Sequence, residues 1–321
     1  MAQTDRRAPA ALPRSALTGN QIRGFWAAWG GWALDGMDSF IYALIMVPAL
    51  RELLPRSAIA NYFVGSHFGW RAMFAVGGAP ALLIAFIRFG VTEPRRWTSK
   101  LDQIRSLTMY SALAELFSPQ FRRRTILNCL YVLVSIVGLW AGSVYVPAAV
   151  ISLATRAGYA VAYGNRLASY ATMLLAVATI IGCVVLPPMA EKWGRRATLG
   201  IYFAVMLVSI PLTFGYAFYM PVNALPWFMA CLFLIGFGGG NFAMYTLWLP
   251  EQYPTECRAS AFALATSVGR FAGAGITFLV GAGVSHFHTV GTPVALTGLA
   301  FGIGLLLLPF GEETRGKPLP A

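Results

Sequence analysis

The stretch from Ile22 to Leu50, IRGFWAAWGGWALDGMDSFIYALIMVPAL, is apolar apart from Arg23, Asp35 and Asp38. A helix that crosses a bilayer needs about 20 mostly apolar residues, and this stretch supplies them. A charged side chain at bilayer depth costs roughly 2.5–3.5 kcal/mol on insertion scales, so it is retained mainly where it has a function. The two acids are three residues apart, which puts both on nearly one helical face. The stretch predicts a membrane helix with a paired acidic site.

The composition of the whole chain agrees with this interpretation. Hydrophobic residues make up 57% of the 321 residues and charged residues only 11%, against about 25% charged residues in soluble domains. An average this apolar over the whole length excludes a globular domain with a single anchor. The net charge of +12 does not indicate nucleic-acid binding, because the basic residues are scattered at the ends of the apolar segments.

Seven further segments are long and apolar enough, or nearly so, to cross a membrane. They are Met73–Phe89, Thr125–Val150, Leu167–Met189, Thr198–Tyr219, Trp227–Leu249, Ala259–Val284 and Pro293–Phe310. All eight are predicted to be helices, because lipid offers no partner for unpaired backbone groups. Most of the 24 Lys and Arg residues then fall on one side, which the positive-inside rule assigns to the cytoplasm together with both termini.

The longest polar stretch between predicted spans, residues 92–124, contains a short helical pattern. Its apolar residues are Leu107, Tyr110, Leu113, Leu116 and Phe117. This spacing is typical of an amphipathic helix that lies on the inner membrane surface, or of a connector helix packed against the bundle. The pattern leaves both alternatives open.

Four local patterns stand at defined places relative to the spans. They are Gly31–Asp38 (GWALDGMD) in the first span, the loop Glu191–Arg196 (EKWGRR), the loop Pro250–Arg258 (PEQYPTECR) and the ending Glu312–Lys317 (EETRGK). In this order the chain resembles the major facilitator superfamily of secondary transporters. The first pattern is similar to that of the sialate and organic-acid proton symporters.

The resemblance implies a helical bundle of twelve spans in two six-helix halves, whereas this chain has room for about eight. We expect a fold class of all-α membrane protein with two plus six spans, lacking about four helices of the N-terminal half through an internal deletion near Ser57–Asn61. The expected organisation is a cytoplasmic tail (1–21), an incomplete N-terminal bundle (22–91), a cytoplasmic central loop (92–124), a C-terminal six-helix bundle (125–311) and a cytoplasmic C-terminal tail (312–321).

Asp35 and Asp38 are candidates for proton coupling. Two close, buried carboxylates raise one another's pKa, which permits protonation near neutral pH. The alternative is that one acid pairs with a basic residue or caps a helix break at Gly36. Arg270 stands in the middle of a span, where its planar fork suits a carboxylate substrate. A structural ion pair with an acid remains the alternative for Arg270.

Two further groups of residues are candidates for the transport path. Asn241 and Tyr245 follow a glycine-rich run that allows close helix contact or a bend, and either could line the substrate cavity. The resemblance implies a second group, charged contacts that close an inner gate. Its residues are Glu191, Gly194, Arg195, Arg196, Glu251 and Arg258. Arg195 and Arg196 could instead serve only to fix the orientation of the chain.

The sequence therefore predicts a proton-coupled secondary transporter of a small organic anion (a carboxylate or a sialate-like acid) that works by alternating access in a bacterial inner membrane. Its expected partners are the anion, protons and the lipid bilayer, without nucleic acid, and no catalytic residues, metal or other cofactor are expected. His286 and His288 lack further ligands nearby in the sequence. The alternative is an internally deleted, non-transporting paralogue or a subunit of a larger assembly, and self-association is left open.

Overall fold

The computed structural model describes residues 109–318 and 320, a helical region in which six helical segments are long and apolar enough to cross a membrane. These six coincide with the six spans predicted over residues 125–310, so the all-α membrane fold is confirmed. The two predicted spans Ile22–Leu50 and Met73–Phe89, with Asp35 and Asp38, lie outside the described residues. The total of eight spans, the domain limits and the deletion near Ser57–Asn61 stay predictions.

Three of the six segments are single continuous helices. They are α7 (Arg122–Arg156), α8 (Val161–Trp193) and α12 (Arg258–Phe287). Each contains a long apolar run that forms a helix because every backbone group then bonds within its own segment. Pro147 in α7 and Pro187 and Pro188 in α8 are accommodated inside these helices.

The other three segments are interrupted. α9 (Arg195–Ile210) continues as a π-helical turn, η1 (Pro211–Tyr216), and a short η2 (Ala217–Tyr219), because Pro211 cannot donate a backbone hydrogen bond. α10 (Ala224–Gly239) is separated from α11 (Phe242–Trp248) and η3 (Pro250–Gln252) by Gly240 and Asn241. The last segment comprises α13 (Gly291–Thr297), α14 (Leu299–Leu307) and η4 (Leu308–Phe310).

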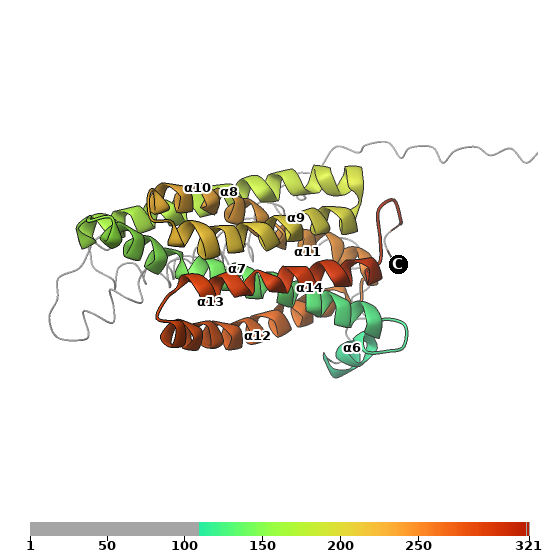
Figure 1. Ribbon diagram of the computed structural model, residues 1–321. Coiled ribbons are helices and arrows are strands. Elements are labelled where there is room, and N and C mark those ends of the chain that lie inside the picture. The colour runs from blue at the N-terminus through green and yellow to red at the C-terminus, as the bar shows by residue number, and fades with distance from the viewer. Residues whose placement is uncertain (1–108, 319, 321) are drawn as a thin grey trace, which may run out of the picture. The chain divides into compact units, whose positions relative to one another are not determined.

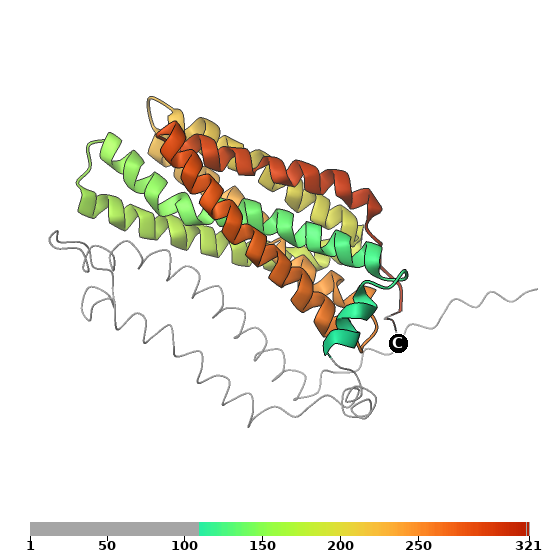
Figure 2. The same cartoon turned by 90° about the horizontal axis from the view of Figure 1, so that it is seen from below.

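The helices run side by side along one common direction, as Figures 1 and 2 show. α7 is the most deeply buried of the six segments and packs against α8, α12 and α14. α8 and α12 are the least buried of the six, and each leaves several large apolar side chains exposed. α7 therefore forms the centre of the described bundle, and the exposed faces of α8 and α12 lie at its outside.

Glycines bring α8 and α10 into direct backbone contact. A Cβ at Gly236 would lie 2.5 Å from the Leu175 carbonyl oxygen, and one at Gly182 would clash with the Phe237 carbonyl. Thr179 closes the contact by donating its hydroxyl to the Gly236 carbonyl at 2.9 Å. The glycine-rich run thus provides both the close helix contact and the break after α10 that its composition allows.

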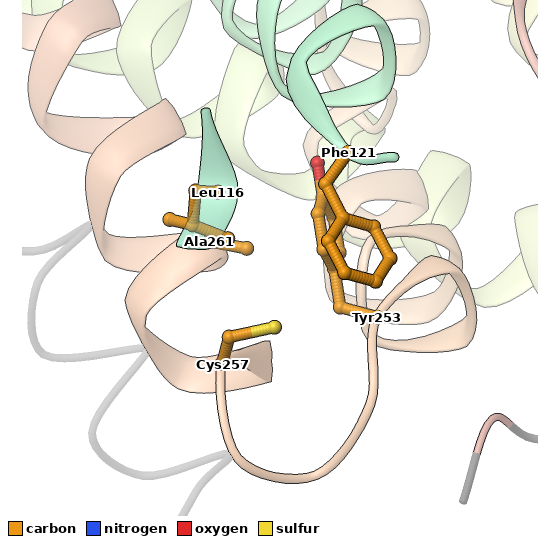
Figure 3. Close-up of a cluster of buried hydrophobic side chains, with 5 residues drawn as sticks. All are labelled: Leu116, Phe121, Tyr253, Cys257 and Ala261. Carbon is orange, nitrogen blue, oxygen red and sulfur yellow. The ribbon is translucent and has the colours of Figure 1, made fainter. Parts of the chain in front are cut away.

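The predicted helix in the polar stretch is present as α6 (Met109–Leu116). Leu116 is fully buried in a cluster with Phe121, Tyr253, Cys257 and Ala261 (Figure 3). α6 therefore packs against the start of α12 and the loop before it, as the connector alternative predicts. Phe117, the residue after α6, is more than half exposed.

Candidate functional site

A buried arginine organises the end of the bundle where α8 meets α9. Arg195, the first residue of α9, donates to both carboxylate oxygens of Glu251, with Nε–Oε2 and Nη2–Oε1 distances of 3.0 and 2.7 Å. The same Nη2 donates to Glu191 at 2.8 Å, and Nη1 donates to the Ala190 carbonyl at 3.2 Å. Planar two-point pairing of this kind is the strong geometry for an arginine and a carboxylate. The ion pair thereby ties α8 and α9 to η3.

Gly194 lets the chain turn between α8 and α9 within one residue. Its φ of +93° and ψ of 163° lie in a region that is nearly restricted to glycine. A Cβ at this position would also lie 2.7 Å from the Glu313 carboxylate. Gly194 is therefore required both for the turn and for the approach of Glu313.

The Glu313 carboxylate caps the start of α9. It accepts hydrogen bonds from the backbone N–H groups of Arg195 and Arg196 at 2.9 and 3.1 Å, and from that of Arg315 at 3.1 Å. Burial alone would raise the pKa of Glu313, but these donors and the charge of Arg195 outweigh it and hold the pKa below its ordinary value. Thr314 beside it donates its hydroxyl to Glu251, so the segment after η4 joins the Arg195 cluster.

A second set of contacts joins the same C-terminal segment to α7. Arg124 forms an ion pair with Glu312 at 2.6 Å and also donates to the Gln252 carbonyl. The Trp248 indole donates to the Glu312 carbonyl at 2.9 Å. Arg196 donates to the carbonyls of Leu308 and Pro309 at the end of the last helix, where a positive charge is favoured by the helix dipole.

Buried amides link α7 to the loop before α12. Asn128 donates to Gln252 Oε1 and to the Tyr253 hydroxyl at 3.2 and 3.1 Å, and Gln252 donates back to Asn128. Thr125 bonds both the Leu116 carbonyl and the Tyr253 hydroxyl. This satisfied polar network fixes the position of η3, and therefore of Glu251.

The structure brings four of the six predicted gate residues together, since Glu191, Gly194, Arg195 and Glu251 meet at one point. Arg196 lies beside them but binds backbone carbonyls. Arg258 donates to the Tyr253 carbonyl at 3.2 Å and closes its own loop instead. The role of these six residues as a gate stays a prediction.

The predicted substrate residues lie in two different environments. Asn241 is fully buried, with its Nδ2 donating to the Gly238 carbonyl at 2.9 Å, while within the described region Oδ1 has no partner. Tyr245 is also buried, and its hydroxyl bonds Ser135 Oγ and the Tyr131 carbonyl at 2.6 and 2.7 Å. Arg270 lies halfway along α12 on an exposed side. Their role in substrate binding remains untested.

Glu313 and Thr314 were not among the predicted site residues, although they belong to one of the four sequence patterns. The signal that could have found them is their position directly after the last span, on the same side as the Glu191–Arg196 loop. Chemically, the cluster is a set of charge-assisted bonds between helix ends. Such bonds can break and reform when the ends move apart, because Glu191 is already open to water, with 66% of its side chain exposed.

Comparison with known proteins identifies the family. The model of the Major Facilitator Superfamily matches residues 57–277, more than half of the chain. The chain is 26% identical over 296 residues to the niacin transporter NiaP of Acinetobacter baylyi, covering 82% of this chain and 63% of the relative. It is 28% identical over 295 residues to a probable 4-methylmuconolactone transporter of Cupriavidus pinatubonensis, covering 89% and 59%. The chain thus spans about 60% of the length of these relatives, both of which are named as transporters rather than enzymes.

A solved structure shows the same fold. A double tryptophan mutant of XylE matches with a TM-score of 0.57 and 20% identity, over 90% of this chain and 66% of the other. The fold and the six membrane-length helices are those of an integral, multi-pass membrane protein. The resemblance predicted from the four sequence patterns is confirmed, and the chain belongs to the major facilitator superfamily.

Proposed function

We propose that this protein is a secondary transporter that carries a small organic anion together with protons across a bacterial inner membrane. Membership of a transporter family supports transport as the activity. The relative named as a niacin transporter supports an organic acid as the substrate class. Accumulation against a gradient requires coupling to another solute, and the carboxylates Asp35 and Asp38, predicted from the sequence to stand inside a span, could bind a proton.

The observation that carries the mechanism is the buried ion pair between Arg195 and Glu251 at the end of the helices. In alternating access, two bundles rock about a site near the membrane midplane. Closure at one side then needs contacts that hold in one state and release in the other. A bidentate pair that joins α9 to η3 within the C-terminal bundle, with Glu191 as an exposed third member, would hold these helix ends in one arrangement and release them in the other.

The other roles follow from chemistry and position in the sequence. Arg270 would bind the carboxylate of the substrate, and Asn241 and Tyr245 would supply hydrogen bonds beside it. Asp35 and Asp38 would take up the coupled proton. Protonation of one acid would remove one negative charge as the anion binds. The loaded site would then have a lower desolvation cost when the cavity closes around it.

Uptake into proteoliposomes tests the proposal. The purified chain is reconstituted, and accumulation of labelled nicotinate and cis,cis-muconate is measured with an inward proton gradient, without it, and with a protonophore. We expect accumulation of at least one acid only with the gradient. Lack of any acid flux, with the protein correctly inserted, would contradict transport by this chain.

Single substitutions separate the proposed roles. Asp35→Asn or Asp38→Asn should abolish gradient-driven accumulation while leaving exchange of labelled for unlabelled substrate, because only the proton step is lost. Arg270→Gln should raise the half-saturating anion concentration at least tenfold.

Glu251→Gln should slow net uptake several-fold, whereas the matched Glu191→Gln should retain most of it. Activity equal to that of the unchanged protein in the Asp35, Asp38, Arg270 and Glu251 variants would refute the assigned roles.

A second candidate is a non-transporting protein or a subunit that completes its bundle with another chain. The observation that favours it is the coverage of only 63% and 59% of the relatives' length. In that case reconstituted chain alone gives no flux, and flux appears when a separately expressed N-terminal half of the niacin transporter is added.

A further inference from the structure

Two cavities share a wall at the end of the bundle where α7 begins and the last helix ends. The first has a volume of about 340 Å³ and a mixed polar and apolar lining. It is lined by Arg123, Arg124, Leu127, Asn128, Tyr131, Gln252 and residues 309–312. The second, of about 410 Å³, is lined by Arg122, Arg123, Ile126, Leu127, Leu307 and Phe310. We call them the polar pocket and the apolar groove. Arg123, Leu127 and Phe310 line both, so they are two parts of one amphipathic site.

The charge at this site is positive and only partly compensated. Arg124 is paired with Glu312, which also binds Lys317 at 3.1 Å. Arg122 and Arg123 are exposed, and neither forms an ion pair with an acid of the described region. All three arginines stand in the first turn of α7, where no acidic residue is present and the helix dipole disfavours cations. An anionic group placed here would therefore lower the electrostatic free energy of the helix start.

The apolar groove is a shallow surface depression beside these charges, formed by the first residues of α7 with Leu307 and Phe310. Ile126 and Leu127 lie one turn after Arg123 and continue its face of the helix. Ile126 and Phe310 are each at least half exposed. In Figures 1 and 2 the start of α7 and the end of α14 lie at the same end of the bundle, next to the C-terminus. A molecule with a negative head and an apolar tail fits this order of charges and apolar side chains.

We propose that this site binds one anionic phospholipid. Its phosphate lies between Arg123, which lines both parts, and Arg122 at the start of the apolar groove, and one acyl chain lies beside Ile126, Leu127 and Phe310. Each Lys or Arg near the membrane surface contributes roughly 1 kcal/mol to the binding of anionic lipids, which corresponds to about fivefold in affinity. The apolar side chains beside the arginines distinguish a lipid from a soluble phosphate, which would use the arginines alone. The lipid would hold the start of α7 against the end of α14.

Native mass spectrometry of the full chain in detergent tests this site. Phosphatidylglycerol and phosphatidylcholine with identical acyl chains are added, and the bound fraction is measured for each. We expect preferential binding of phosphatidylglycerol, and a loss of about fivefold in Arg123→Gln. Arg315→Gln is the matched control, because it removes one exposed arginine at the same end outside both cavities. Equal binding of the two lipids, or an equal loss in both variants, would overturn the proposal.

A second pair of measurements separates lipid from soluble phosphate. Ile126→Asn places a polar group in the groove without changing charge and should lower phosphatidylglycerol binding several-fold, while a large excess of inorganic phosphate should not displace the lipid. If inorganic phosphate displaces it and Ile126→Asn binds normally, the ligand is a free phosphate and the lipid assignment is wrong. Arg123 and Ile126 are exposed, and unchanged melting temperatures of the variants establish that each one is folded.

Discussion

At the scale of single residues, the two carboxylates that bind Arg195, those of Glu191 and Glu251, allow a direct comparison of an exposed and a buried ion pair. Both bond the same Nη2 atom, but the side chain of Glu251 is 17% exposed and that of Glu191 is 66% exposed. Removal of one charge from a buried pair costs about 3–5 kcal/mol, because the other charge stays buried, whereas an exposed pair contributes about 1 kcal/mol or less. We expect Glu251→Gln to lower the free energy of unfolding by about 3 kcal/mol and Glu191→Gln by less than 1 kcal/mol. Denaturant unfolding in detergent measures both, and equal losses would contradict the assigned burial.

The Glu313 cap makes stability depend on pH with a defined sign. The pKa of Glu313 is below its ordinary value of 4.5 in the folded protein. The stabilisation is therefore fully present above that ordinary value and is lost as the pH falls through the lower folded-state value. We expect Glu313→Gln to lower the melting temperature at pH 7, and the difference from the unchanged protein to shrink as the pH is lowered below 4.5. A difference of the same size at neutral and acidic pH would show that the carboxylate charge is not responsible.

Sequence patterns predicted which residues form the Arg195 cluster better than they predicted the other contacts of the same loops. Glu191, Gly194, Arg195 and Glu251 were predicted from two loop patterns, and they meet in the structure. Arg258 belongs to the same pattern as Glu251 but bonds its own loop. The cap at Glu313 could not be derived from local rules, because a helix start is usually capped by the residue just before it. Here the cap comes from a segment 118 residues away in the sequence.

At the scale of helices, the crossing of α8 and α10 depends on the absence of side chains. A Cβ at Gly236 would meet the Leu175 carbonyl at 2.5 Å and the Ala178 Cβ at 2.7 Å, and neither atom can move without its helix. We expect Gly236→Ala to destabilise the protein by about 1–3 kcal/mol, the usual cost of overpacking. Gly275→Ala in α12 is the control, because no described atom lies within 4 Å of its Cβ position. Equal melting temperatures of the two variants would refute the close crossing.

The docking of α6 can be followed through the thiol of Cys257. Burial, followed by the nearby carboxylates of Glu115 and Glu256, raises the pKa of this thiol to about 11, so it is protonated at neutral pH. Leu116 is fully buried beside it (Figure 3). Leu116→Ala should cost about 2–5 kcal/mol in a well-packed cluster and should open it.

We expect slow maleimide labelling of Cys257, measured in a variant whose other three cysteines are replaced by alanine, and at least tenfold faster labelling after Leu116→Ala. Phe117→Ala is the control, since Phe117 follows the same helix but is largely exposed. Fast labelling of all three proteins would mean that α6 does not cover the thiol.

Hydropathy predicted the positions of the six described spans to within a few residues, because length and apolar content decide them. The interruptions were only partly predictable. The close contact and the break after α10 were the two outcomes that the run Gly236–Gly240 allowed, and both occur. The π-helical turn at Pro211 was not predicted, since an average over about 20 residues does not register a single wide turn. The distribution of burial was not predicted either: α7 is the most buried of the six segments and α12 the least.

At the scale of the whole molecule, the described bundle has two unlike ends. One end carries Arg122–Arg124, Lys192, Arg195, Arg196, Arg258, Arg315 and Lys317, whereas the Lys and Arg residues of the other end are Arg156 and Arg166. Chains insert with the more basic loops in the cytoplasm. This asymmetry favours a cytoplasmic location for the Arg195 cluster, for the proposed lipid site and for the C-terminus.

Reporter fusions check this orientation in cells. A fluorescent protein fused after Ala321 should fluoresce, and alkaline phosphatase at the same place should be inactive, because the first folds in the cytoplasm and the second needs an oxidising compartment. Fusions truncated after His288, in the turn between α12 and α13, are the control and should give the opposite result. Active phosphatase at the C-terminus would show that the bundle has the opposite orientation in the membrane. The Arg195–Glu251 pair would then close the outer side, and the anionic lipid would belong to the outer leaflet.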